Sequence, residues 1–359
     1  MTSFHQAVAE GDFERVQLLV ESPVPGGEQD VRQLNRRQEP PMYIACRNGS
    51  LEIVKFLYEH GAQEDVLTSS RSWTPMLAAC FQGHLNIVKF LYENGAQIHI
   101  TQPNHLGQTP MYGASFNGHL EIVKFLYDHG AQEDVTTIVT TNATPLYVAC
   151  QNGHLEIVTF LYEHGAKEDT SRADKDGDSP LLVACEKNHL DIVEFLYEHS
   201  AKEDIRRPDN KGYTPMWSAC QNNHLKIVQF LCNHGAAEDT NKICDDEVTP
   251  LGEACENDFI DIVQWLVLQG IPSIGNIESW RNKLNTQNQL DLFKLALASR
   301  DVDHESFLTL VNIVQHSGVQ ACGVHLIHIR GILEHIGEYV RGKNQARLLF
   351  HRIIEMGDP

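Results

Sequence analysis

A segment of about 35 residues recurs through three quarters of this 359-residue chain, and no other feature restricts the fold as strongly. The clearest marker of the repeat is a proline near the start of each copy. This proline occurs at Pro41, Pro75, Pro110, Pro145, Pro180, Pro215 and Pro250. The spacing is 34 residues once and 35 residues thereafter. Repetition with a fixed period of this length predicts a solenoid, in which about 270 residues stack as one elongated body.

The most regular part of each copy is a segment typified by residues 118–131. Near copies occupy residues 49–62, 83–96, 153–166, 188–201 and 223–236, and a weaker copy occupies 258–270. In residues 118–131, the polar side chains of Glu121, Lys124 and Asp128 fall on one side of a helix, and apolar side chains cover the rest. We expect a helix sandwiched between its neighbours, which Gly130 ends by adopting the left-handed conformation.

A second, shorter helix is predicted to open each unit. The dipeptide Thr109-Pro110 is a favourable start, because threonine caps helices and proline is tolerated at the first helical position. An alanine on this helix keeps it thin enough for close stacking. The alanines are Ala45, Ala79, Ala114, Ala149, Ala184, Ala219 and Ala254. The helix is expected to end at residue types that tolerate left-handed backbone. These are Gly49, Gly83, Gly118, Gly153, Asn188, Asn223 and Asp258.

The Thr-Pro-x-x-x-Ala opening, the Gly-His-Leu turn and the His-Gly-Ala ending resemble ankyrin repeats over roughly residues 4–270. The resemblance implies an all-α solenoid of about eight helix pairs, with residues 4–22 as the N-terminal capping pair. Three regions are therefore predicted. They are a capping repeat and loop at 1–38, an ankyrin repeat array at 39–270 and a helical region at 271–359. The period exceeds the 33 residues usual for the family, and we expect the additional residues in the finger-like connectors.

The resemblance stops near residue 270, where the period is lost. Four helices are predicted beyond it, near residues 287–299, 304–316, 324–341 and 344–356. They either cap the last repeat or form an adaptor module that recruits a second machine such as a ubiquitin ligase, although no clear adaptor box is present. An enzyme with its site in this region is a third, disfavoured alternative, because its histidines have no evident nucleophile or metal-ligand partner beyond Cys322.

The excess negative charge of the chain lies in the repeats. Residues 1–270 contain 19 Lys and Arg against 39 Asp and Glu, whereas residues 271–359 contain nine of each group. Nucleic acid is an unfavourable partner, because phosphate binding needs clustered cations. The charge serves either solubility or attraction of a basic partner. Because a signal region and a segment long enough to span a bilayer are both lacking, we expect a cytoplasmic chain, with the nucleus as an alternative, and no membrane insertion.

The cysteines are not spaced for disulfide bonds. Six share one register, each directly after an alanine: Cys46, Cys80, Cys150, Cys185, Cys220 and Cys255. Equivalent sites on stacked helices lie roughly 8–10 Å apart, which exceeds the Cα separation that a disulfide allows. We therefore predict that these cysteines are small buried apolar residues.

The histidines are not arranged for metal binding. Ten of them form two series, His84, His119, His154, His189 and His224, and His60, His129, His164, His199 and His234. Imidazoles repeated once per unit run parallel and do not converge on one ion. The ankyrin resemblance implies instead that they join the turns of adjacent repeats by hydrogen bonds. No metal or cofactor is expected.

No sequence motif indicates catalysis. A glycine-rich phosphate loop, a nucleophile elbow and a Cys-x-x-Cys pair are all absent from the sequence. Glu-Asp pairs recur after the long helices, at Glu64-Asp65, Glu133-Asp134, Glu168-Asp169, Glu203-Asp204 and Glu238-Asp239. Paired carboxylates need a cleft for acid–base chemistry, and we interpret these as a solvated acidic ridge on exposed connectors.

Binding is the remaining function. The ankyrin resemblance implies that partners meet a concave face made of the short helices and the fingers. The aromatic residues expected there are Trp73, Phe81, Tyr112, Phe116, Tyr147, Tyr213 and Trp217. Exposed aromatics are typical anchors of interfaces. For Tyr112, Tyr147 and Trp217 the alternative is that they fill space beside the fingers. The sequence therefore predicts a monomeric scaffold that binds a protein or peptide, basic or mixed in charge.

Overall fold

The structure of the chain is a computed structural model that describes residues 3–21, 30–70, 72–199, 202–244, 248–257 and 259–268. Within these ranges there are sixteen α-helices and no strand, which confirms the all-α prediction of about eight helix pairs. The four helices expected beyond residue 270 lie outside the described residues. The chain divides into two compact units, residues 1–210 and 211–359.

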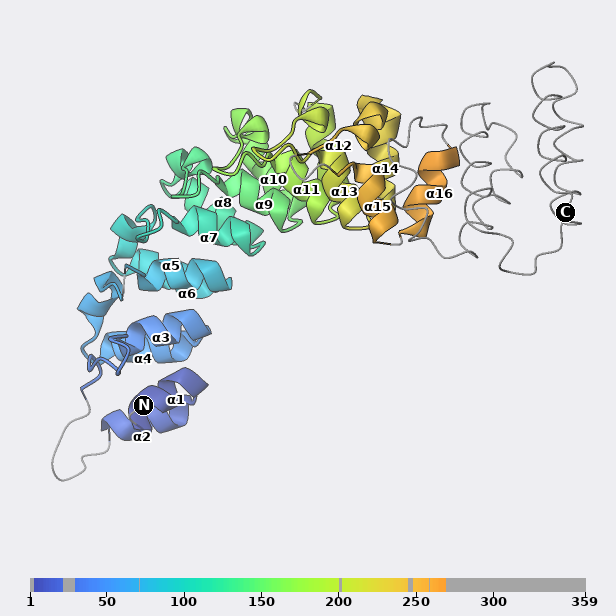
Figure 1. Cartoon of the computed structure of the whole chain (residues 1–359). Helices are drawn as coiled ribbons and strands as arrows, with labels where there is room; N and C mark the ends of the chain where they lie inside the picture. The colour runs from blue at the N-terminus through green and yellow to red at the C-terminus, as the bar shows by residue number, and fades with distance from the viewer. Residues whose placement is uncertain are drawn as a thin grey trace, which may run out of the picture. The chain divides into compact units, whose positions relative to one another are not determined.

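The first unit contains six helix pairs, which follow one another in chain order (Figure 1). They are α1 Ser3–Glu10 and α2 Phe13–Glu21, α3 Pro41–Asn48 and α4 Leu51–Glu59, α5 Pro75–Gln82 and α6 Leu85–Glu93, α7 Pro110–Phe116 and α8 Leu120–Asp128, α9 Pro145–Gln151 and α10 Leu155–Glu163, and α11 Pro180–Glu186 and α12 Leu190–His199. Short 3₁₀ turns follow five of the pairs. These are η1 Gln63–Leu67, η2 Ala96–His99, η3 Gln132–Thr136, η4 Glu168–Ser171 and η5 Asp204–Arg206.

The second unit continues the same alternation in its described residues. It contains α13 Pro215–Gln221 and α14 Leu225–Leu231, then α15 Pro250–Glu256 and α16 Ile260–Leu268. The segment η6 Cys232–Ala236, whose backbone is non-helical at His234 and Gly235, and a 3₁₀ turn, η7 Ala237–Asn241, lie between the two pairs. In both units, we call the first and second member of each pair the first helix and the second helix. We call the loop that precedes a first helix a finger.

The predicted starts of the first helices are confirmed, and so are their predicted ends except Asp258, which lies outside the described residues. Each first helix from α5 to α13 begins after a threonine or serine whose hydroxyl oxygen accepts a hydrogen bond from the backbone N–H three residues later. These capping residues are Thr74, Thr109, Thr144, Ser179 and Thr214. The turn after the helix has positive φ angles, 83° at Gly83 and 66° at Asn188. Glycine adopts this conformation without strain, and asparagine tolerates it better than most residues.

The core lies mainly along the first helices, which pack closely on one another. Apart from the last turns, the side chains of the first helices from α3 to α13 are buried, including the cysteines Cys46, Cys80, Cys150, Cys185 and Cys220. Burial raises the pKa of the Cys46, Cys80, Cys150 and Cys185 thiols. The prediction that these cysteines are small apolar core residues is confirmed for these five. The side chain of Cys255 lies outside the described residues.

The second helices are less enclosed than the sequence predicted. On α8, Ile122 and Leu126 are buried, but Phe125 and Tyr127 are only half-buried. The expected packing of the helix between its neighbours is confirmed, because α8 contacts α6, α7 and α10, although its outer side chains are only partly enclosed. Aromatic side chains of successive second helices contact one another on this outer side. The Tyr92 ring meets the Phe125 ring edge to face, with centroids 5.6 Å apart. The same contact recurs at Tyr58–Phe90, Tyr127–Phe160 and Tyr162–Phe195.

The two histidine series have different roles. In the first, the Nε2 atoms of His84, His119 and His154 donate hydrogen bonds of 3.2 Å to carbonyl oxygens of the preceding repeat. This confirms the predicted link between adjacent turns. In the second, His129 stacks on Phe125 at 4.0 Å, and its Nδ1 donates to the Phe125 carbonyl oxygen at 2.7 Å. The expectation that this second series also joins turns is wrong, because each of these rings is held by the last turn of its own helix.

Candidate functional site

Two positions recur at a fixed register around each first helix. One is the finger residue that precedes the capping residue, and the other is the residue eight positions later, on the last turn of the helix. We call them a finger–helix pair. The pairs are Glu39/Arg47, Trp73/Phe81, Gln108/Phe116, Ala143/Gln151, Asp178/Glu186 and Tyr213/Gln221. The first five belong to the first unit, one pair for each of α3, α5, α7, α9 and α11.

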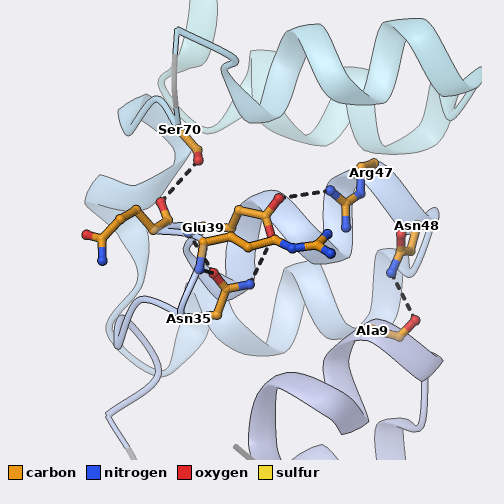
Figure 2. A network of polar contacts seen from close by, with 8 residues as sticks. Ala9, Asn35, Glu39, Arg47, Asn48 and Ser70 are labelled. Atoms are coloured by element: carbon orange, nitrogen blue, oxygen red, sulfur yellow. Dashed lines mark hydrogen bonds and ion pairs between the residues drawn. The ribbon is translucent and has the colours of Figure 1, made fainter. Parts of the chain in front are cut away.

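The pair at α3 is an ion pair. Arg47 Nη1 lies 3.1 Å from Glu39 Oε1, and the Arg47 guanidinium also lies over the Tyr43 ring. The other oxygen of Glu39 accepts a hydrogen bond of 2.8 Å from Asn35 Nδ2 (Figure 2). Next to Arg47, Asn48 Nδ2 donates to the Ala9 carbonyl oxygen, which joins α3 to the N-terminal pair. Both charges of this finger–helix pair are thus satisfied within the chain.

The pair at α5 is aromatic. The ring centroids of Trp73 and Phe81 are 4.9 Å apart, and both side chains are half-buried. The Phe81 ring covers the backbone of Gly113 on the next first helix, where an added Cβ would lie 2.2 Å from Phe81 Cδ2. Phe81 is therefore partly a packing residue. The sequence contained a signal for this contact, because Gly113 stands where neighbouring first helices have Ala78 and Val148.

The pair at α7 contributes the most exposed aromatic residue among those predicted to bind. Phe116 is 37% exposed. Its ring lies 6.4 Å from the ring of Tyr112, nearly parallel to it. Gln108, the finger member of the pair, accepts a hydrogen bond of 2.7 Å from Asn104 Nδ2. Phe116 thus projects from a first helix whose remaining side chains are buried.

The pair at α11 brings two acids together. Asp178 lies close to Glu186 and to the finger carboxylates of Asp174, Asp176 and Asp209, and burial and these charges together raise its pKa to about 6. Asp174 shapes the finger, because its Oδ1 accepts hydrogen bonds from the backbone N–H groups of Asp176 and Asp178. Glu186 is bonded to Lys187 at 2.7 Å. The register that holds an ion pair at α3 therefore holds a concentration of negative charge at α11.

Three of the seven predicted partner-binding residues are nearly covered in the structure. Tyr112 and Trp217 are 7% exposed and Tyr147 is 4% exposed. The Tyr147 hydroxyl donates to Asp174 Oδ2 at 3.3 Å. In the second unit, the Tyr213 ring stacks on Trp217 with centroids 4.0 Å apart. Trp73, Phe81, Phe116 and Tyr213 are the members with accessible ring surface.

Comparison with protein-family models identifies the repeats. The model for ankyrin repeats in three copies matches residues 4–102, 64–139, 111–209, 166–241 and 201–275, which overlap to cover the chain from residue 4 to residue 275. The chain belongs to the ankyrin-repeat family. Ankyrin repeats generally mediate protein–protein interactions. A comparison with curated proteins gave no match.

The acidic pairs of this ankyrin-repeat chain differ from the expected solvated ridge. Their glutamates are exposed, but the aspartates are buried, with exposed fractions of 0–7%. These are Asp65, Asp134, Asp169, Asp204 and Asp239. The sequence interpretation was wrong for them because the 3₁₀ turns direct the aspartate and the residue after it toward the core. Arginines approach several of these carboxylates, for example Arg32 Nε at 2.9 Å from Asp65 Oδ1.

Asp134 has the least charge compensation of this group. Thr137 takes the place of an arginine, with its hydroxyl 3.5 Å from Asp134 Oδ1, and Oδ2 has no hydrogen-bond partner among the described residues. Burial raises the pKa of Asp134 to about 7. The ankyrin repeat next to it departs from the pattern, because Ile98-His99 replaces the Glu-Asp pair. Ile98 is 69% exposed and lies on η2, which is neither a first helix nor part of a finger–helix pair.

Two other kinds of site can be assessed in the described part of the ankyrin array. Across these ranges, His, Cys, Asp and Glu side chains do not gather in groups of three or more that could hold a metal ion. None of the helices in the same residues combines the length and apolar character needed to cross a bilayer.

Proposed function

We propose that this chain is a non-catalytic scaffold that binds a protein or peptide on the face formed by the fingers and the last turns of the first helices. The observation that carries the proposal is the exposure of Phe116, which projects from the otherwise buried helix α7, on whose Gly113 the Phe81 ring packs. Large exposed aromatic side chains are favoured as interface anchors because they bury much apolar area at low entropic cost.

The titratable groups of the described residues support a binding role over a catalytic one. The buried thiols have raised pKa values, which disfavours the nucleophilic thiolate. His119 and His154 hold backbone carbonyl oxygens, and burial lowers their pKa values. These histidines are therefore neutral structural donors at physiological pH. We propose that the chain acts as a cytoplasmic or nuclear monomer, with its array at 39–270 between a capping region at 1–38 and a separate region at 271–359.

The experiment is site-specific photocrosslinking in cells. A photoreactive phenylalanine derivative is placed at Phe116 in one variant and at Ile98 in the control variant, because both side chains are exposed but only Phe116 lies on the proposed face. We expect a discrete protein adduct from position 116 and none of the same mass from position 98. An adduct from position 98 alone, or from neither position, contradicts the proposed face.

The protein identified by crosslinking then allows a quantitative test. Phe116→Ala is expected to weaken its binding by about 1–3 kcal/mol, the usual range for an interface anchor, while Ile98→Ala leaves the affinity unchanged. Calorimetric titration of the purified partner with each variant measures both values. Equal affinities of the two variants for the partner contradict the assignment of Phe116 as an anchor.

A further inference from the structure

The finger–helix pairs of the first unit differ in chemistry along the stack, and this order indicates what the proposed face binds. From α3 to α11 the pairs are an ion pair, two aromatic residues, Gln with Phe, Ala with Gln, and two acids. The inference rests on the proposed binding function and specifies its partner. It depends on which of these pairs present apolar surface or charge to a partner.

The α3 pair has little to offer, because its two charges neutralise each other. Arg47 is bonded to Glu39, and Glu39 is also bonded to Asn35. A partner that used either charge would first have to break these contacts, so the pair offers it little net gain. The α3 pair therefore marks an edge of the binding surface.

The pairs at α5 and α7 offer apolar surface. Trp73 and Phe81 present the exposed parts of two rings in contact, and Phe116 lies on the next first helix. The contact of Phe81 with Gly113 joins α5 to α7, so the rings belong to adjoining repeats. A large apolar side chain of a partner would cover this surface and remove it from water.

The pairs at α9 and α11 change the surface from neutral to acidic. Ala143 is buried and Gln151 is half-buried, so the α9 pair carries no charge. At α11, Asp178 and Glu186 lie together, and Asp174 and Asp176 of the same finger add to the negative potential. Asp174 Oδ1 accepts hydrogen bonds from the backbone N–H groups of Asp176 and Asp178, which holds the acids of this finger close together. Burial and these neighbouring carboxylates raise the pKa of Asp178, and a cation of the partner would offset the repulsion among the charges. Lys187 offsets part of the charge of Glu186.

We propose that the face from α5 to α11 binds an extended protein segment whose large apolar side chain contacts Phe81 and Phe116 and whose Lys or Arg side chain contacts Asp178 and Glu186. The spacing follows from the repeat geometry. Stacked helices lie about 8–10 Å apart, so two repeats separate Phe116 from Glu186 by about 16–20 Å. An extended chain advances roughly 3.3 Å per residue, so the two anchors are about five or six residues apart in the partner.

The test uses random 16-residue peptides displayed on phage, selected on the full-length chain. Three variants are compared with it. Asp178→Asn with Glu186→Gln removes the acidic pair without changing its shape, and Phe81→Leu with Phe116→Ala reduces the aromatic surface. The control, Glu168→Gln with Glu203→Gln, removes two charges from exposed glutamates on the connectors.

We expect selected peptides to share a large apolar residue and at least one Lys or Arg about five or six positions away. Their affinity for the Asp178/Glu186 variant falls about tenfold or more, and for the control less than twofold. The Phe81/Phe116 variant is expected to lose binding of all selected peptides, whether or not they contain a basic residue. Peptides that bind the wild type but show no basic preference, or that bind the Asp178/Glu186 variant equally well, overturn the inference. They leave the proposed binding function intact, because that function is tested separately by crosslinking at Phe116. A library that yields no binder also overturns the inference of a linear segment.

Discussion

The second helices and the finger–helix pairs recur with the same period, but only the second helices keep nearly the same side chains. The sequence Leu-Glu-Ile-Val-Lys-Phe-Leu-Tyr is present on α4 and α8, and close variants form α6, α10 and α12. The finger–helix pairs, in contrast, change from Glu39/Arg47 at α3 to Asp178/Glu186 at α11. Both sets are built on the same stack, so the difference does not arise from the fold.

The reason for the difference lies in what the side chains contact. On the second helices, Leu126 is buried in the stack and the Tyr92 and Phe125 rings cover each other across repeats, so each copy constrains its neighbour. At the end of a first helix, the side chain of Phe116 reaches solvent and has few such constraints. Near identity between copies therefore marks residues that hold the stack together. Variation at a fixed register marks residues available for recognition.

The largest effect is expected for a buried second-helix residue. Leu126→Ala removes a fully buried side chain and leaves a cavity, which costs about 2–5 kcal/mol. Lys124→Ala on the same helix is the control, because Lys124 only pairs with Glu121 at the surface and such pairs contribute little. Urea unfolding followed by circular dichroism measures both variants. Similar losses of unfolding free energy for Leu126→Ala and Lys124→Ala would contradict the view that the buried side chains of the second helices hold the stack together.

The next largest effect is expected around Phe81. This residue combines both roles, because part of its ring is exposed for recognition and part packs on Gly113. Gly113→Ala places a methyl group 2.2 Å from the ring, and we expect it to displace Phe81 and to cost about 1–3 kcal/mol of stability. In a Phe81→Ala background the same change is expected to stabilise the protein by up to about 1 kcal/mol, because alanine favours helix over glycine. A double-mutant cycle by urea unfolding measures this coupling. Equal effects of Gly113→Ala in the two backgrounds would contradict the contact.

These residues also show how far sequence alone predicted the molecule. The start of a first helix at Thr109-Pro110 and its end at Gly118 depend on local signals, and both were predictable. The burial of Asp134 was not, because a Glu-Asp pair does not indicate which of its side chains a 3₁₀ turn directs inward. The contact of Phe81 with Gly113 spans two repeats, so it required comparing copies of the repeat for an unusual glycine.

A smaller effect is expected at Asp134. Most repeats have an aspartate at this position, but among the described residues no arginine offsets the charge of Asp134. Its pKa is raised from 3.8 in the unfolded chain to about 7 by burial. The folded state therefore prefers the protonated acid, and the stability that this group contributes falls as pH rises from 3.8 through 7. Asp134→Asn is expected to stabilise the protein by about 1–2 kcal/mol at pH 8.5, and this gain shrinks toward pH 5. Thermal unfolding at both pH values measures it.

Asp65→Asn is the matched control for Asp134. Asp65 occupies the same register, but its Oδ1 lies 2.9 Å from Arg32 Nε, so the amide removes a charge partner from the arginine. Burial raises the pKa of Asp65 as well, but Arg32 opposes this shift, so we expect less stabilisation at pH 8.5 than for Asp134→Asn. If Asp134→Asn fails to stabilise the protein, or does so equally at pH 5, then the burial of the Asp134 carboxylate is not the source of the effect.

The smallest effect is expected at the first finger–helix pair and tests whether these positions are free to vary. Arg47→Gln breaks the ion pair with Glu39, but Glu39 keeps its hydrogen bond from Asn35, and the Arg47 side chain is about one-third exposed. Partly exposed ion pairs contribute about 0–1 kcal/mol, so we expect a loss within that range. Urea unfolding beside the Leu126→Ala variant measures the contrast directly. A loss above about 2 kcal/mol would mean that the pair supports the stack, because a single exposed pair does not contribute that much. Variation between repeats at a fixed position would then no longer show that the position is free of a structural role.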